Sequence, residues 1–319
     1  MKKGSYRELY RTCLLCPRRC GVNRLEGQRG FCGETDAVRI AWAGLHRGEE
    51  PPVSGSHGSG TIFFTGCTLR CAFCQNHQLS RGQTGREVTA QELSGVMLDL
   101  QEQGAENINF VTGTHFIPGI LEALDRARDG GMTLPVVWNS SGYETREMAR
   151  LLSPRVDLWL PDLKTLEDDL SSRLFQGGAY PEAARGLIDF IVERMASGEG
   201  ESGITWEGRP LKLLIRHLIL PGYMDSTRRV LEYYAPRAGG GVSFSLMTQY
   251  TPVPGAAEGS PRRILKRDEA ETAYRWLEDL GIEEGFFQGP PDGEEWLPDF
   301  TRPEPFPAGY ARKVWIWNE

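Results

Sequence analysis

Three cysteines, Cys67, Cys71 and Cys74, follow the apolar run 61–65 at the spacing C-x3-C-x2-C. Three thiolates can hold three irons of a cubane 4Fe-4S cluster and leave the fourth iron open. A closed structural or electron-transfer cluster normally has four protein ligands, so the missing thiolate predicts an iron that binds another ligand. A zinc knuckle lacking its fourth ligand, or unrelated cysteines of a reduced protein, would also give this pattern.

Four further cysteines lie near the N-terminus at the spacing C-x2-C-x3-C-x11-C: Cys13, Cys16, Cys20 and Cys32. Four thiolates this close in sequence, with glycines and a proline for tight turns, indicate a second metal site in a reducing cell. A second 4Fe-4S cluster and a structural zinc site both fit, and a site without metal is the third interpretation. The crowding of the first three cysteines favours a cluster over the paired knuckles of a zinc ribbon.

Bulk properties restrict the class of protein. The chain has 319 residues, 39% of them hydrophobic, which allows one sizeable domain with a smaller attachment. The net charge is −7 without a basic block, and no apolar stretch reaches the roughly 18 residues of a membrane span, so neither nucleic acid nor membrane is an expected partner. No apolar segment follows the charged N-terminus, so we expect no signal peptide. Seven cysteines at metal-ligand spacings favour a reducing, oxygen-poor cytoplasm over a disulfide framework.

From residue 61 onward, short apolar runs alternate with longer amphipathic segments. The runs predict strands buried on both faces at 61–65, 107–112, 135–139, 156–160, 211–220 and 242–247. Helices are predicted at 90–103, 117–128, 144–152, 181–195, 225–234 and 268–280, the first opened by a capping box from Thr89 to Glu92. Six strand–helix units imply a parallel sheet with right-handed crossovers, either a barrel or a doubly wound sheet.

Three regions are expected along the chain. Residues 1–60 form a Cys-rich N-terminal region with the auxiliary metal site, and residues 61–290 form the strand–helix domain. The tail 291–319 is rich in proline and aromatic residues. We expect this tail to pack over the open edge of the sheet without taking part in chemistry.

Polar residues or glycine follow five of the predicted strands. In parallel strand–helix folds these carboxyl ends meet at one edge, where ligands bind. One such end is ordinary turn chemistry, but five in register predict a lined pocket. The segments are 111–115, 138–143, 160–164, 216–222 and 245–252.

Side-chain direction along a strand limits what these residues can reach. Asp162 and Lys164 stand two positions apart and face the same side, where they bind a ligand or form a plain salt bridge. Arg216 and His217 are adjacent and face opposite sides, so at most one reaches a ligand directly.

The other histidines carry weaker signals. His115 either contacts a ligand or caps a loop. His46 and His57 are expected on the surface.

The segment 66–76, Gly-Cys-Thr-Leu-Arg-Cys-Ala-Phe-Cys-Gln-Asn, resembles the cluster motif of the radical SAM superfamily, with Phe73 and Asn76 at its aromatic and asparagine positions. In that superfamily S-adenosylmethionine (SAM) chelates the open iron, and an electron from the cluster cleaves it to a 5′-deoxyadenosyl radical. The resemblance implies an α/β fold, a partial (β/α)6 radical SAM barrel, here with a small Cys-rich N-terminal region.

Other motifs narrow the resemblance. Asp162-Leu163-Lys164 and Leu220-Pro221-Gly222 are similar to the activating enzymes of glycyl radical enzymes, typified by pyruvate formate-lyase activating enzyme. Thr-Gly-Thr-His at 112–115 and Gln-Tyr-Thr-Pro at 249–252 are shared with a branch similar to those activases.

The resemblance also implies SAM contacts. The backbone of Thr112 and Gly113, with Thr114 as a further candidate, would hold the SAM amino group, although the family's Gly-Gly-Glu-Pro is absent here. The hydroxyls of Ser140 and Ser141 would serve the carboxylate or the ribose. The remaining assignments are Lys164 to the carboxylate, Asp162 to the ribose or Lys164, Arg216 and His217 to the adenosine or the carboxylate, and His115 to SAM or substrate.

The implied activity is reductive cleavage of SAM and abstraction of a hydrogen atom, with electrons from a donor such as flavodoxin or ferredoxin. In the activase version the hydrogen comes from a glycine Cα of a partner glycyl radical enzyme. A radical enzyme that modifies a small molecule or peptide is the first alternative, since the simplest activases lack the N-terminal cysteines. A non-catalytic two-cluster electron carrier is the second.

Overall fold

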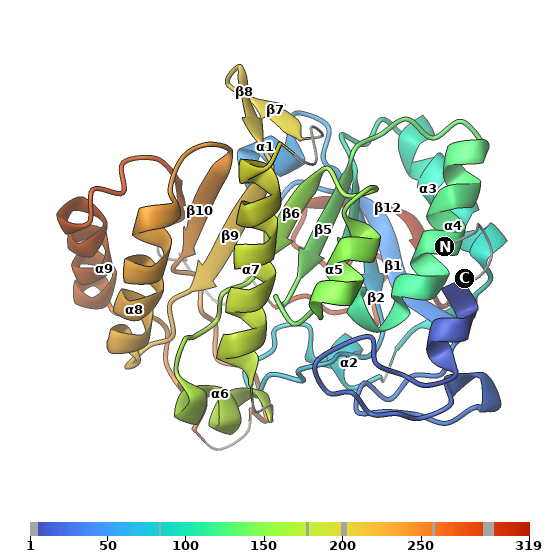
Figure 1. Cartoon of the computed structure of the whole chain (residues 1–319), viewed down its shortest axis with the longest axis horizontal. Coiled ribbons are helices and arrows are strands. Elements are labelled where there is room, and N and C mark those ends of the chain that lie inside the picture. Colours follow the sequence, from blue (N-terminus) through green and yellow to red (C-terminus); the bar gives the residue numbers. More distant parts are fainter. Residues whose placement is uncertain (1–5, 83, 177–178, 199–202, 257–258, 290–296) are drawn as a thin grey trace.

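The computed structural model describes residues 6–82, 84–176, 179–198, 203–256, 259–289 and 297–319 (Figure 1). Parallel strands form its centre. Strands that are neighbours in this sheet also belong to consecutive strand–helix units of the sequence. These strands confirm the predicted partial (β/α)6 barrel and the class of fold. In spatial order they are β2 (Ser59–Phe64), β4 (Ile108–Val111), β5 (Val136–Ser140), β6 (Leu158–Pro161), β9 (Leu213–Leu218) and β10 (Val242–Met247).

Helices connect the strands and lie against one face of the sheet, in front of it in Figure 1. The capping box is confirmed: the Thr89 side chain accepts the Glu92 N–H at 3.1 Å, and the Glu92 carboxylate accepts the Thr89 N–H at 2.7 Å. The connecting helices are α3 (Ala90–Glu102), α4 (Ile117–Asp129), α5 (Arg146–Leu152), α7 (Tyr180–Ala196), α8 (Met224–Tyr234) and α9 (Arg267–Asp279).

Some elements were not predicted because they are short. The eight-residue helix α6 (Asp168–Phe175) precedes α7 and buries Leu174 and Phe175. A small hairpin occupies the start of the predicted strand 211–220, which therefore begins later. These additional elements are α1 (Pro51–Ser54), α2 (His77–Ser80), the hairpin β7 (Ile204–Trp206) and β8 (Arg209–Leu211), and 3-10 helices at Tyr6–Tyr10, Arg24–Glu26, Thr114–Phe116 and Ala235–Arg237.

Both edges of the parallel sheet carry added strands. At one edge β1 (Val38–His46) runs antiparallel to β2, and β12 (Ala311–Ile316) runs antiparallel to β1. β3 (Arg86–Val88) also pairs with β1, and β11 (Phe286–Phe287) continues the other edge beside β10. The N-terminal region and the tail are thus both parts of the main sheet.

An aromatic cluster joins the tail to the first strands. Phe306 meets the Trp42 ring edge-on with centroids 5.4 Å apart, and Phe300 lies 5.1 Å from Phe63. Residues 291–296 of the tail, including Trp296, lie outside the described residues. In the described part of the chain, no helix combines the length and apolar character that crossing a membrane requires.

Candidate active site

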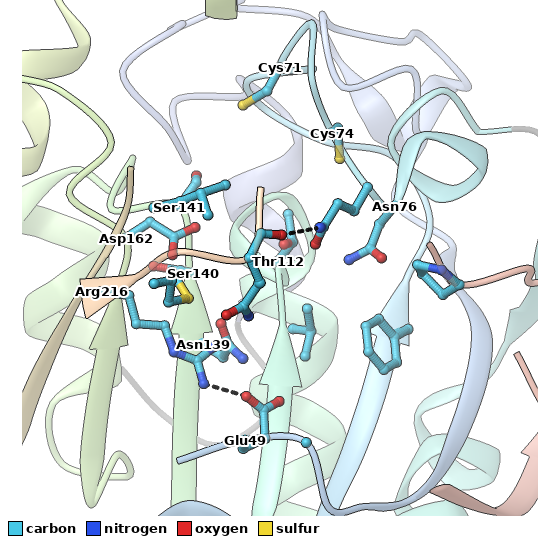
Figure 2. Close-up of a pocket in the computed structure, with 18 of the residues that line it drawn as sticks. Glu49, Cys71, Cys74, Asn76, Thr112, Asn139, Ser140, Ser141, Asp162 and Arg216 are labelled. Carbon is cyan, nitrogen blue, oxygen red and sulfur yellow. Dashed lines mark hydrogen bonds and ion pairs between the residues drawn. The ribbon is translucent and has the colours of Figure 1, made fainter. Parts of the chain in front are cut away.

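A cavity of about 280 Å³ is lined by the cysteine loop, the ends of the central strands, the segment after β1 and the C-terminal tail. Figure 2 shows Cys71 and Cys74 at one end and Glu49 at the opposite end, with Thr112 and Arg216 between them. The predicted site residues that line the cavity are Cys67, Cys71, Phe73, Cys74, Asn76, Thr112, Ser140, Ser141, Asp162, Lys164 and Arg216.

The cysteine loop is held by packing and by its own amides. Its Ala72 N–H donates to the Leu174 carbonyl of α6 at 2.7 Å. Phe73 meets the Phe175 ring with centroids 5.9 Å apart, so the superfamily's aromatic position is an internal anchor of the loop. The unpredicted helix α6 is therefore what supports the loop from outside.

The thiols of this loop have an environment suited to a cluster. The Leu69 and Arg70 N–H groups donate to Cys67 Sγ at 3.3 and 3.5 Å, and such bonds stabilise a thiolate and tune a cluster potential. Burial raises the pKa of Cys74 to about 11 and also raises that of Cys71. Thiols in this state lose their protons when metal binds.

Among the described residues, no three His, Cys, Asp or Glu side chains form a ready-made site for a metal ion. The fit of the cysteines to a cluster therefore depends on their spacing, their burial and these N–H···S bonds.

Asp162 and Lys164 form an ion pair at the cavity, with Lys164 Nζ 2.6 Å from Asp162 Oδ2. Burial alone would lower the pKa of Lys164, but the Asp162 carboxylate raises it, so the ammonium is retained. The Tyr180 hydroxyl accepts the Lys164 N–H at 2.9 Å and lies 3.0 and 2.9 Å from the carbonyl oxygens of Ser141 and Asp162. Tyr180, which the sequence did not single out, thus fixes two strand ends relative to each other.

A buried carboxylate positions the neighbouring strand ends. Glu144 accepts the Thr114 hydroxyl at 2.6 Å, the Trp138 N–H at 3.2 Å and the Ser140 hydroxyl at 3.1 Å. Burial raises the pKa of Glu144 against the lowering effect of these three bonds. The Thr114 hydroxyl is directed to this carboxylate, and Thr114 does not line the cavity.

The backbone of Thr112, which lines the cavity, is strained. Its φ of 55° lies in the left-handed region, which costs a β-branched residue about 1–3 kcal/mol. The Thr112 N–H donates to the Asn139 carbonyl at 2.8 Å, which holds the strained residue in place. Gly113 does not line the cavity. A Cβ at this position would lie 2.6 Å from the Ile120 side chain and 3.2 Å from that of Trp138.

Two predicted contact histidines face the protein interior. His115 Nε2 donates to the Thr65 carbonyl at 2.7 Å, and burial lowers its pKa to about 3. His217 Nδ1 donates to the Leu163 carbonyl at 2.7 Å, its Nε2 lies 3.0 Å from Thr227 Oγ1, and burial lowers its pKa to about 4. Neither lines the cavity, so both are neutral internal supports in this structure.

The prediction that His46 lies on the surface is wrong, whereas that for His57 is confirmed. The His46 side chain is 12% exposed and lines the cavity, while that of His57 is 70% exposed. His46 ends β1, and the tail covers it through Phe306, 4.5 Å away between ring centroids. No local pattern signals a contact made with residues so distant in the sequence.

Arg216 faces the cavity but is already paired. It forms ion pairs with both Glu49 and Glu50, and its Nε donates to Glu50 Oε1 at 2.9 Å. Glu49 lines the cavity and Glu50 lies behind it, 3% exposed. The sequence analysis missed both acids, since only tertiary contact with β9 gives them a role.

The N-terminal cysteines lie beside the cysteine loop. Arg18, between Cys16 and Cys20 in sequence, stacks on the Phe31 ring at 3.6 Å and donates from Nε to the Thr68 carbonyl at 3.0 Å. The Phe31 N–H donates to Cys20 Sγ at 3.5 Å. Cys13, Cys16 and Cys32 are buried, and burial raises the pKa of Cys16 to about 12.

Gly66 shows how tightly the two cysteine segments meet. Its φ is +80°, and a Cβ at this position would lie 2.9 Å from the Cys32 carbonyl oxygen and 2.6 Å from Glu34 Cγ. Only glycine combines this conformation with so close an approach.

One family model matches the central part of the chain. Residues 61–196 match the family described as the Radical SAM superfamily. This segment contains the cysteine loop and the strand ends at Thr112, Ser140 and Asp162.

Two curated proteins are similar to this chain in sequence, and one solved structure is similar to it in fold. It is 29% identical to the uncharacterized protein MJ0674 of Methanocaldococcus jannaschii, over 87% of this chain and 77% of that protein. It is 26% identical to the pyruvate formate-lyase-activating enzyme of Clostridium pasteurianum, over 53% of this chain and 65% of that enzyme. The fold is similar to that of a radical SAM methyltransferase from Sphaerobacter thermophilus, with a TM-score of 0.51 and 16% identity over 75% of this chain and 68% of that one.

Proposed function

We propose that Cys67, Cys71 and Cys74 bind a 4Fe-4S cluster and that the protein cleaves SAM reductively to abstract a hydrogen atom from a substrate. The three thiolates would hold the cluster, whose chemistry would be one-electron reductive cleavage of the SAM sulfonium to methionine and a 5′-deoxyadenosyl radical. The observation that carries the proposal is that these three thiols line the same cavity as four polar strand ends. An external one-electron donor such as flavodoxin or ferredoxin supplies the reducing equivalent.

The protein's own residues would hold SAM in place. Lys164 keeps a positive charge at the cavity wall and suits a carboxylate, while Asp162 fixes its direction. The hydroxyls of Ser140 and Ser141 suit the ribose or the carboxylate, and the strained Thr112 backbone suits the amino group. Orientation and exclusion of water are the protein's contribution to the reaction.

The test is SAM cleavage by the anaerobically reconstituted, reduced protein. We expect 5′-deoxyadenosine from the wild type and none from Cys71→Ala, whose remaining two loop thiols cannot hold the cluster. SAM should also change the EPR signal of the reduced cluster. Cleavage retained by Cys71→Ala would contradict the cluster assignment, and an EPR signal indifferent to SAM would favour the electron-carrier alternative.

We further infer that Cys13, Cys16, Cys20 and Cys32 hold a second 4Fe-4S cluster. The Phe31 N–H···S bond and the contact of this segment with Thr68 support a redox site beside the first one. Wild-type protein should contain about eight irons per chain and Cys71→Ala about four. Zinc instead of the second set of irons would assign a structural site.

Two classes of hydrogen donor remain to be distinguished. Similarity to pyruvate formate-lyase-activating enzyme supports a glycine Cα of a partner glycyl radical enzyme. The tail residues Phe306 and Tyr310 line the cavity beside His46 and Gly48, and they support a small molecule because they cover the end of the cavity near Glu49. Deuterium transferred to 5′-deoxyadenosine from a glycine-deuterated partner would establish the activase. Unlabelled 5′-deoxyadenosine would favour a small molecule as the hydrogen donor.

A further inference from the structure

The end of the cavity opposite the cysteines holds an unbalanced ion cluster, made of Arg216, Glu49 and Glu50 (Figure 2). One guanidinium meets two carboxylates, so the formal charge of the cluster is −1. Burial would raise the pKa of Glu50, but the Arg216 charge lowers it, so this acid stays ionised behind the wall. The remaining carboxylate, Glu49, lines the cavity and is 8% exposed.

Apart from Arg216, which Glu49 shares with Glu50, the groups around Glu49 carry no compensating charge. Asn109 donates from Nδ2 to Glu49 Oε1 at 3.2 Å and carries no charge. His46 Nδ1 lies 3.8 Å from the same oxygen, and burial lowers the pKa of His46, so the ring is neutral near pH 7.

Two polar atoms beside Glu49 are buried and lack a hydrogen-bond partner in the described part of the chain, His46 Nδ1 and Asn109 Oδ1. Asn109 is 0% exposed. A buried surplus carboxylate flanked by unsatisfied polar atoms is costly without a compensating partner. The geometry points to a partner from outside the chain.

We propose that Glu49, with His46, binds a positively charged amine group of a small-molecule substrate in this end of the cavity. Phe306 packs on His46 at this end, and Leu218 and Met247 also line the cavity, so apolar side chains would bury the rest of such a molecule. The proposal rests on the proposed function and names the class of substrate for its small-molecule form. Its occupant is a compound with an ammonium or guanidinium group.

SAM is itself cationic, but its proposed contacts lie elsewhere in the cavity. Cys71 and Cys74 stand at the opposite end from Glu49, and Asp162 lies nearer to them (Figure 2). The charge of Glu49 is therefore expected to leave SAM binding unaffected.

The test uses 1-butylammonium as the probe, with butyrate and 1-butanol as anionic and neutral compounds of similar size. Binding to the anaerobically reconstituted protein is measured by saturation-transfer NMR, with and without SAM. We expect butylammonium to bind at least about tenfold more tightly than either control compound. Stronger or equal binding of butyrate or butanol would overturn the proposal without the use of any variant.

Glu49→Gln keeps the size of the side chain and removes its charge. We expect this variant to lose about tenfold in butylammonium affinity while its SAM affinity stays within about twofold. Glu122→Gln removes one charge from the exposed pair with Arg126 on α4 and should bind the probe like the wild type.

Loss of SAM affinity in Glu49→Gln with unchanged butylammonium binding would assign the surplus charge to SAM and overturn the inference. Failure of the protein to cleave SAM would contradict the proposed function alone, since probe binding is read separately.

Discussion

At the residue scale, buried polar side chains hold the strand ends that line the cavity. Tyr180 is 0% exposed and bonds to the backbone of Ser141, Asp162 and Lys164. The Glu144 carboxylate accepts a hydrogen bond from the Ser140 hydroxyl. These groups touch no ligand themselves, so their role is positioning.

Tyr180→Phe should weaken SAM binding more than it changes the fold. The variant leaves the Lys164 N–H without an acceptor, which costs about 1–3 kcal/mol of unfolding free energy. Because Asp162 and Lys164 would then shift, we expect the Kd for SAM to rise several-fold. Equilibrium dialysis and urea denaturation measure the two effects, and Tyr233→Phe, whose hydroxyl bonds to Asp189 instead, is the matched control. Unchanged SAM affinity would contradict the positioning role.

His217 should make stability depend on pH. Its pKa is about 4 in the folded state against an ordinary 6.5, so below pH 6.5 only the unfolded chain takes up the proton. Stability is therefore present above pH 6.5 and lost as the pH falls toward 4, by about 1.4 kcal/mol per unit at most.

His217→Gln removes this titration, so the wild type should lose about 2 kcal/mol more than the variant between pH 7 and 5. Urea denaturation at the two pH values measures this, with exposed His57→Gln as control. Parallel pH curves for wild type and His217→Gln would contradict the pKa argument.

At the element scale, the contact between the two cysteine segments depends on Arg18. Its guanidinium reaches the carbonyls of Thr68, Phe175 and Gln176 while it stacks on Phe31. The N-terminal segment, the cysteine loop and the end of α6 therefore meet at one side chain.

Arg18→Lys keeps the charge but loses the planar fork and the stacking. We expect about 1–2 kcal/mol of destabilisation and a changed EPR spectrum of the Cys67/Cys71/Cys74 cluster, because the Thr68 carbonyl lies within its loop. Arg19→Lys is the matched control, since the exposed Arg19 side chain lies 4.0 Å from the exposed Glu147 carboxylate. Identical EPR spectra for Arg18→Lys and wild type would show that the N-terminal segment does not influence this cluster through Arg18.

At the scale of the whole molecule, the two ends of the chain complete the barrel. β1 and β12 extend the sheet beyond β2, and Phe306 closes the cavity over His46 while packing on Trp42. The end of the cavity near Glu49 is thus built from residues about 260 positions apart in the chain, 46 and 306.

Phe306→Ala should open this end of the cavity. The variant loses buried aromatic surface, at about 2 kcal/mol of unfolding free energy for a half-buried ring. SAM binding at the cysteine end should stay unchanged, whereas solvent exchange of the amides around His46 should rise. Hydrogen exchange by mass spectrometry measures this, with exposed Phe287→Ala as control. Protection unchanged at residues 40–50 would show that the tail does not close the cavity.

The sequence by itself determined the strand–helix domain and the motif residues. The runs 61–65, 107–112 and 135–139 are apolar enough to be buried on both faces, and the cysteine spacing is local, so both could be predicted. Parallel strands place their carboxyl ends together, which is why Thr112, Ser140 and Asp162 were predicted to share a pocket.

Only the tertiary structure decided which polar side chains face the cavity and which support it from behind. Adjacent residues of a strand point to opposite faces, and the structure shows that Arg216 faces the cavity, paired with Glu50, whereas His217 faces the interior. His46, Tyr180 and Glu144 acquire their roles from partners elsewhere in the chain. Such contacts leave no period or motif in a single sequence, because they depend on packing between elements.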